Sequence, residues 1–444
     1  MQIGTVSKQL ADFIHDTSFE DLPPQVVEQA KSRVLDCLST AIAARGLPIP
    51  QLALRFVEAN RGEATIFGSE LRVPGIDAAL VNATLVNGRS QDDYLEKSHP
   101  SALTIPAAAA IAEEEHSSGK EFLTGIVLGY EIVARTYMGG PAMLPKFRAS
   151  GVAGAVGAAA TAGKLLKLPV PQLMNALGYS AMFASGFGEG FLSGTMEVKF
   201  NVGWACRSGV TAAMLARLGA TASPTAFEGE SGFFRAFAGT VEHAEAATRD
   251  LGKRFLMTNV VYKECPVCLF VQTPIHLGKT LAQERNIDPN KIKRVSVLAP
   301  EAAYTNPGYR NVAPYRTNLQ ARVSARFCTA AALLRKPVES HDFYEQSRSD
   351  PQILALAEKI DLVEPTNDTE RVALEVIHDG ERLYMTATQA ETMRPTMDKI
   401  VSKFRRLTAD FLGKRTDQVI DTVLGLERIK NIRELTDQLR FKDQ

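Results

Sequence analysis

The chain has 444 residues, of which 45% are hydrophobic and 23% are charged, the balance of a folded globular protein with two or three domains. Fifty Lys and Arg against fifty Asp and Glu give a formal net charge of zero, which excludes a general positive field for nucleic acid or anionic membranes. The five cysteines are few and odd in number, as in proteins of reducing compartments, and the polar N-terminus has no apolar run for export. We therefore expect a cytoplasmic protein that binds neither nucleic acid nor membrane.

Helical periodicity dominates the first half of the chain. The spacing of apolar residues predicts helices over residues 24–44, 75–86, 103–116, 120–137, 152–166 and 205–218. A short strand is expected at residues 64–67. Gly151, Gly154 and Gly157 recur every third residue, a spacing that lets another helix approach closely. These segments predict a tightly packed helical body.

The pattern changes near Cys265. Residues 293–299 alternate like a strand, and residues 371–389 predict a hairpin that turns at Asp379 and Gly380. Further helices are expected at residues 274–285, 322–334, 352–359, 398–412 and 416–426. We therefore predict a mostly α protein, in which residues 1–264 and 392–444 form a large all-helical domain. Residues 265–391 would form a smaller, inserted α+β lid domain.

A polar loop, residues 91–102, lies between two apolar helices and contains Asp92, Asp93 and His99. Loops held by rigid elements often carry the chemistry of an enzyme. Carboxylates can act as bases, and an imidazole can give or take a proton near neutral pH. The alternative is helix capping, with Ser101 starting one helix and Asp92 capping another.

Two cationic segments are further candidates. Lys199 and Arg207 lie on either side of Trp204, the only tryptophan, and a lysine among apolar neighbours can have a lowered pKa and act as a base. Arg148 precedes the glycine-rich helix, where a guanidinium and a helix N-terminus together could hold a carboxylate. The alternatives are a lysine and an arginine that extend into solvent.

Two other motifs have the wrong context for the sites that they suggest. Residues 151–164 end in Gly-Lys, but Leu165 stands where a phosphate loop needs Ser or Thr. Cys265 and Cys268 have the spacing of a zinc or redox site, yet no second cysteine pair follows. We therefore expect no metal site.

Four segments stand in an order that resembles the MmgE/PrpD family: residues 99–135, 153–168, 203–234 and 263–268. This family includes 2-methylcitrate dehydratase, cis-aconitate decarboxylase and iminodisuccinate epimerase. The resemblance runs over essentially the whole chain and implies a helical domain built from both chain ends, an inserted lid, a homodimer and no cofactor. The shared chemistry is removal of a proton next to a carboxylate. Loss of water, loss of CO2 or return of the proton to the opposite face then follows.

The resemblance carries over to some individual residues. The family's His-Pro-Ser segment matches residues 99–101, and its acidic pair matches Asp92 and Asp93. Other positions depart from the family pattern. Ser90 replaces an aspartate, Arg148 stands where many relatives have a histidine, and Lys199 lies one position after the family's lysine.

The resemblance leads us to expect a cofactor-independent lyase that acts on a small di- or tricarboxylate. His99 would be the acid or base, Asp92 or Asp93 would orient it, and Lys199 would be a second proton carrier. The residues expected to bind substrate are Arg148, Lys263, Ser90, Ser101 and Arg207.

Two alternatives remain open. An epimerase or isomerase would exchange the α-proton of a dicarboxylate between two bases on opposite faces, and Arg148 in place of a lyase histidine fits that reaction as well. A family member without catalytic activity would act as a binding protein, since several acid/base positions are altered. Retention of His99 and Asp92 argues against this last alternative.

Overall fold

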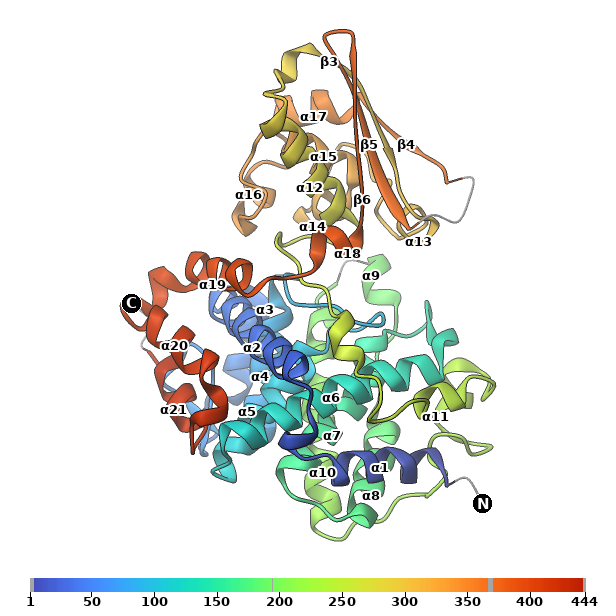
Figure 1. The fold of residues 1–444 in the computed structure, drawn as a ribbon, viewed down its shortest axis with the longest axis vertical. Helices are drawn as coiled ribbons and strands as arrows, with labels where there is room; N and C mark the ends of the chain where they lie inside the picture. The colour runs from blue at the N-terminus through green and yellow to red at the C-terminus, as the bar shows by residue number, and fades with distance from the viewer. Residues whose placement is uncertain (1–3, 194, 366–369, 442–444) are drawn as a thin grey trace. The chain divides into compact units, whose positions relative to one another are not determined.

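The computed structural model describes residues 4–193, 195–365 and 370–441 (Figure 1). The chain divides into two compact units: unit 1 comprises Met1–Val260 and Thr396–Gln444, and unit 2 comprises Val261–Pro395. The described residues are mostly helical, as the sequence predicted. None of the helices in these ranges combines the length and the apolarity that crossing a bilayer requires.

Unit 1 is built almost entirely of helices. In chain order they are α1 (Val6–Asp16), α2 (Pro24–Ala44), α3 (Pro48–Val57), α4 (Gly75–Gly88), α5 (Ser101–Glu114), α6 (Gly119–Gly139), α7 (Ala149–Leu165), α8 (Val170–Phe183), α9 (Glu189–Ser193), α10 (Glu197–Arg217), α11 (Phe233–Ala238), α19 (Met397–Leu412), α20 (Arg415–Leu424) and α21 (Arg433–Thr436). The short strands β1 (Ala64–Thr65) and β2 (Arg72–Val73) pair antiparallel. Helix α19, which follows unit 2 in the sequence, packs against α2, so both parts of the chain build one helical body (Figure 1).

Helix α7 is buried along nearly its whole length and packs against α5, α6 and α10. A Cβ atom at Gly154 would overlap the side chain of Leu103 in α5, and one at Gly157 would overlap Val133 in α6. A Cβ atom at Gly151 would overlap Asn201 in α10, so the glycine repeat brings α7 close to three different helices, where the sequence suggested one neighbour. This packing fixes the N-terminal end of α7, which carries Arg148.

Unit 2 combines a four-stranded sheet with helices. The sheet order is β4 (Ile360–Val363), β3 (Ile292–Leu298), β5 (Arg371–His378) and β6 (Glu381–Thr388). Strands β3 and β4 pair parallel, and the other pairs are antiparallel. The predicted hairpin is confirmed: Asp379 and Gly380 join β5 to β6 with φ of 53° and 87°, the left-handed conformation that a tight hairpin turn requires.

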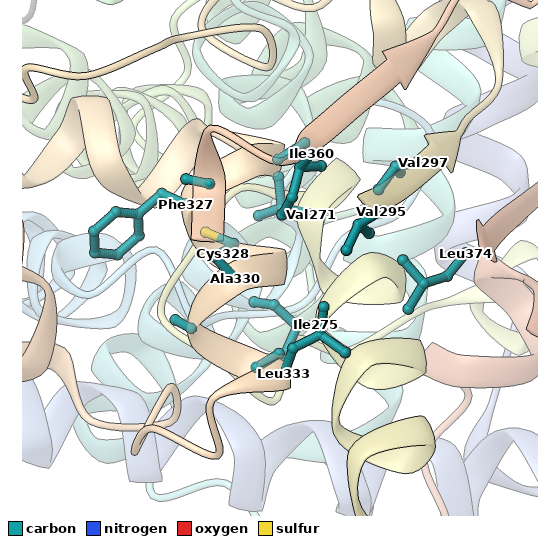
Figure 2. Close-up of a cluster of buried hydrophobic side chains, with 14 of the residues drawn as sticks. Val271, Ile275, Val295, Val297, Phe327, Cys328, Ala330, Leu333, Ile360 and Leu374 are labelled. Atoms are coloured by element: carbon teal, nitrogen blue, oxygen red, sulfur yellow. The ribbon is translucent and has the colours of Figure 1, made fainter. Parts of the chain in front are cut away.

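The helices of unit 2 are α12 (Leu269–Glu284), α13 (Glu301–Tyr304), α14 (Asn318–Val323), α15 (Ala325–Leu333), α16 (His341–Gln346), α17 (Pro351–Ala357) and α18 (Gln389–Met393). Figure 2 shows the core of this unit, in which Val271 and Ile275 of α12 lie near Val295 and Leu374 of the sheet. The single helix predicted over residues 322–334 is wrong, because the Ser324 hydroxyl accepts the Phe327 N–H and starts α15 as a new helix.

Candidate active site

The loop between α4 and α5 holds the central residues of the site. Ser90 has a φ of 56°, so the chain turns sharply just after α4 and runs into the acidic pair. Asp93 then accepts the backbone N–H of Ser101, the first residue of α5, over 3.1 Å. The cap of α5 is thus supplied by Asp93, whereas the sequence had suggested Ser101 for this role. The two helices and this cap fix the loop at both ends.

His99 and Asp92 form an imidazole–carboxylate pair. The Nδ1 atom of His99 lies 3.0 Å from Asp92 Oδ2 and 3.1 Å from the main-chain oxygen of Asp93. Because both neighbours are acceptors, Nδ1 carries the ring hydrogen of the neutral imidazole, and Nε2 is the basic nitrogen. The Asp92 side chain is fully buried, while 17% of the His99 side chain is exposed. The pair therefore has the geometry of a general base oriented by a carboxylate.

Two further contacts hold the His99 residue in place. Its backbone N–H donates to the Ser150 hydroxyl in the first turn of α7 over 3.1 Å. The ring of Tyr94 meets the imidazole edge to face, with 5.5 Å between centroids. The position of the imidazole is therefore fixed from the main chain and from one side of the ring.

Asn87, in the last turn of α4, connects the acidic and basic parts of the site. Its Nδ2 donates to Asp92 Oδ2 over 3.0 Å, and its Oδ1 accepts from Arg148 Nη2 over 3.2 Å. Lys199 Nζ donates to the main-chain oxygen of Asn87 over 2.8 Å. Sequence reasoning missed this residue, and the only signal was a polar side chain at the end of an apolar helix beside the polar loop.

Arg148 and Lys199 place two cations beside this pair. Arg148 donates to the main-chain oxygen of Val198, and Lys199 donates to the Ser90 hydroxyl. Burial lowers the pKa of the Arg148 guanidinium to about 10, while the negative charge of Asp92 acts in the opposite direction. Arg148 is therefore charged at neutral pH. Two cationic side chains that lie close together suit an anionic ligand.

The second member of the acidic pair has a different environment. The Asp93 carboxylate accepts from the Tyr130 hydroxyl over 2.5 Å as well as from the Ser101 N–H. Burial raises the pKa of this carboxyl from 3.8 to about 6, although the charge of Arg33 and these hydrogen bonds act against the rise. Asp93 reaches His99 only through its main-chain oxygen. Of the two aspartates proposed to orient the imidazole, the side chain of Asp92 makes the contact.

The other predicted substrate-binding residues lie in different places. Ser101 is fully buried at the start of α5. Arg207 forms an ion pair of 3.1 Å with Asp77 in the first turn of α4, the opposite end of that helix from Asn87. Eight residues along α10 separate Arg207 from Lys199, roughly 12 Å of helix. Lys263 is buried in unit 2. The structure thus brings together Ser90, Asp92, His99, Arg148 and Lys199, and does not bring Arg207 to this group.

The cysteine pair of unit 2 is poorly suited to metal or redox chemistry. Burial raises the pKa of the Cys265 and Cys268 thiols, which disfavours the reactive thiolate. Across residues 4–193, 195–365 and 370–441, no group of three or more His, Cys, Asp and Glu side chains is arranged to hold a metal ion.

Comparison with known proteins places the chain in a family. Residues 8–246 match the MmgE/PrpD N-terminal domain, and residues 265–426 match the MmgE/PrpD C-terminal domain. The cis-aconitate decarboxylase-like protein of Aspergillus oryzae is 24% identical over 97% of this chain and 96% of its own. The cis-aconitate decarboxylase of Homo sapiens is 25% identical over 83% of this chain and 78% of its own, and that of Aspergillus terreus is 21% identical over 98% and 96%. The resemblance carried by the four sequence segments is confirmed, and the chain belongs to the MmgE/PrpD family.

Proposed function

We propose that the protein is a cofactor-independent lyase that removes a proton next to a carboxylate of a small di- or tricarboxylate. The observation that carries this proposal is the Asp92–His99 pair beside two cations, Arg148 and Lys199. The relatives named above are decarboxylases or resemble one, which favours a lyase over the epimerase.

The proposed first step uses the imidazole and the cations together. Arg148 binds a substrate carboxylate, since a planar guanidinium can donate two parallel hydrogen bonds to it. His99 Nε2 takes the proton from the adjacent carbon, and Asp92 stabilises the imidazolium that forms. The negative charge that develops on the carboxylate is stabilised by Arg148 and Lys199, whose positions are already fixed by Asn87.

Lys199 is the proposed second proton carrier. In a dehydration its ammonium group would donate a proton to the leaving hydroxyl, so that water departs as a neutral molecule. In a decarboxylation His99 would remove no proton from carbon: the electron pair of the broken bond to CO2 stays on carbon, and Lys199 would deliver one proton there as CO2 leaves. Ser90 would orient Lys199 through their hydrogen bond. Lys263 stays a proposed substrate-binding residue.

The test is incubation with 2-methylcitrate, cis-aconitate and iminodisuccinate in D2O, followed by NMR, with His99→Gln as the inactive control. A product formed by loss of water or CO2, and only with the wild-type protein, would support the lyase. Deuterium exchange with inversion of configuration would identify the epimerase instead. If none of the three compounds changes, the lyase proposal for these substrates is wrong, and binding measured by calorimetry would favour the binding protein.

A further inference from the structure

A buried ion pair contacts the loop that carries Asp92 and His99. Lys403 of α19 and Asp36 of α2 are both fully buried, and Lys403 Nζ lies 2.6 Å from Asp36 Oδ1. The same ammonium group donates to the main-chain oxygen of Gln91 over 2.8 Å. Gln91 immediately precedes Asp92, so one cation connects the C-terminal helix to the loop of the proposed general base.

This pair is a poor source of folding stability. Removing two charges from water costs several kcal/mol per ion, and buried ion pairs can often be replaced by apolar residues of similar size without loss of stability. A second cation, Arg33, is also fully buried and lies 3.7 Å from Asp36 Oδ2. Asp36 thus stands between two buried cations, and this fixed arrangement restricts the direction in which Lys403 can donate. We therefore expect this pair to affect the geometry of the loop at Gln91 more than the stability of the fold.

We propose that Lys403 and Asp36 are positioning residues that hold the Gln91 carbonyl and, through it, the carboxylate of Asp92. This inference rests on the proposed function for its effect on turnover. Asp92 Oδ2 receives hydrogen bonds from both Asn87 and His99. A rotation of the peptide that joins residues 91 and 92 would move this oxygen away from one of them. The contact that this inference uses is the hydrogen bond from the Lys403 ammonium group to the main-chain oxygen of Gln91.

The double variant Lys403→Met/Asp36→Leu tests the proposal, because it removes both charges and keeps a similar volume. We expect its melting temperature to fall below that of wild type, because Arg33 stays buried and loses the charge of Asp36, so kinetics are measured at a temperature at which the variant is folded. We expect kcat to fall about 10- to 100-fold with KM changed less than about threefold, because a misplaced catalytic group reduces rate more than binding. The matched control is Arg405→Met/Asp417→Leu, which removes an exposed pair that joins α19 to α20.

A second measurement does not depend on the substrate. The ring 15N shifts of His99, assigned with His99→Gln, report which nitrogen carries the hydrogen. We expect a single Nδ1–H tautomer in wild type and in the control, and a mixture of tautomers in the double variant. If the double variant folds and keeps both the His99 tautomer and the kcat of wild type, the proposal is wrong.

The experiment has to separate failure of the proposed function from failure of this inference. If the wild-type protein turns over none of the substrates, the proposed function fails, and the role of Lys403 and Asp36 is then judged only from the His99 tautomer in wild type and in the double variant. If the double variant does not fold, Lys403→Met removes the donor to the Gln91 carbonyl and leaves Asp36 paired with Arg33. A changed His99 tautomer in that variant would support the proposal, and an unchanged one would contradict it.

Discussion

Asn87 Nδ2 donates to Asp92 Oδ2 over 3.0 Å, so the carboxylate of the proposed base pair is held by a side chain from the preceding helix. Asn87→Ala removes this bond and also the acceptor for Arg148. We expect kcat/KM to fall at least about tenfold, since each lost charge-assisted hydrogen bond contributes about 1.5–3 kcal/mol.

The matched control for Asn87 is Asn82, one to two turns earlier in the same helix. Asn82 is equally buried, and its side chain bonds the main chain of residues 65 and 67. Asn82→Ala should lower the melting temperature and leave kcat/KM of the folded protein unchanged. Equal activity losses in the two variants would show that Asn87 acts only through stability.

His99 should be the residue whose loss is most damaging. His99→Ala and His99→Gln should each reduce kcat by at least about 100-fold, because a positioned acid/base group contributes about 10² to 10⁴ in rate. Circular dichroism should show an intact fold. His116→Gln, at an exposed position, is the control and should keep full activity. If His99→Gln keeps most of the wild-type turnover, His99 is not the proton carrier, and Lys199 or Asp92 must have this role.

Arg148 should act in substrate binding. Arg148→Lys keeps a positive charge but loses the planar pair of donors, so we expect KM to rise at least about tenfold and kcat to change less than about threefold. Arg207→Lys is the matched control, because the Arg207 guanidinium is paired with Asp77, and its KM should stay at the wild-type value. A collapse of kcat at constant KM in Arg148→Lys would assign the arginine to the chemical step.

The buried carboxyl of Asp93 should make stability depend on pH. Its pKa is raised from 3.8 to about 6 in the folded protein, so between these values the folded state binds more protons than the unfolded state. Its contribution to the free energy of unfolding therefore decreases as pH rises through this window, by about 3 kcal/mol in total. Asp93→Asn cannot ionise, so its stability relative to wild type should increase from pH 4 to pH 7. Denaturant unfolding at both pH values measures this difference, and an equal difference at both would contradict the raised pKa.

The homodimer implied by the family remains a prediction, and α10 offers the surface for it. Trp204, Met214 and Leu218 lie on one side of this helix and are 48%, 36% and 84% exposed. Large apolar side chains exposed together are typical of an interface. Light scattering should give twice the chain mass of 48.3 kDa for wild type. The variant Trp204→Glu/Leu218→Glu places two charges on this surface and should give the mass of one chain. Tyr384→Glu, at an exposed position of unit 2, should not change the mass.

The long helices and the hairpin could be predicted because their patterns are local. Helix α2 has the bounds that its apolar periodicity and its Pro24 at the first position indicate, and Asp379-Gly380 specifies the turn of the hairpin. The break at Ser324 depends on one side-chain hydrogen bond, which periodicity does not reveal. Apolar periodicity thus identifies helices but not the caps that divide them.

The candidate site could be predicted in part. The polar loop marked Asp92 and His99, because charged residues between apolar helices stand out. The sequence placed both Lys199 and Arg207 in the site. In the structure Lys199 contacts Asn87, whereas Arg207, about two turns further along α10, pairs with Asp77 at the other end of α4. Lys403 could not be found, since its polar partner belongs to a helix at the other end of the chain.

The pairing of Lys403 with Asp36 spans 367 residues of sequence, and all of unit 2 is translated between them. A nascent chain therefore contains Asp92, His99 and both cations of the site long before it contains α19. Contacts of such long range form late, because the intervening chain must be ordered first. A ribosome-bound or prematurely terminated chain that ends before residue 403 has every proposed catalytic residue but not the lysine that holds the Gln91 carbonyl. The contact between Lys403 and the Gln91 carbonyl can therefore form only after α19 has been synthesised.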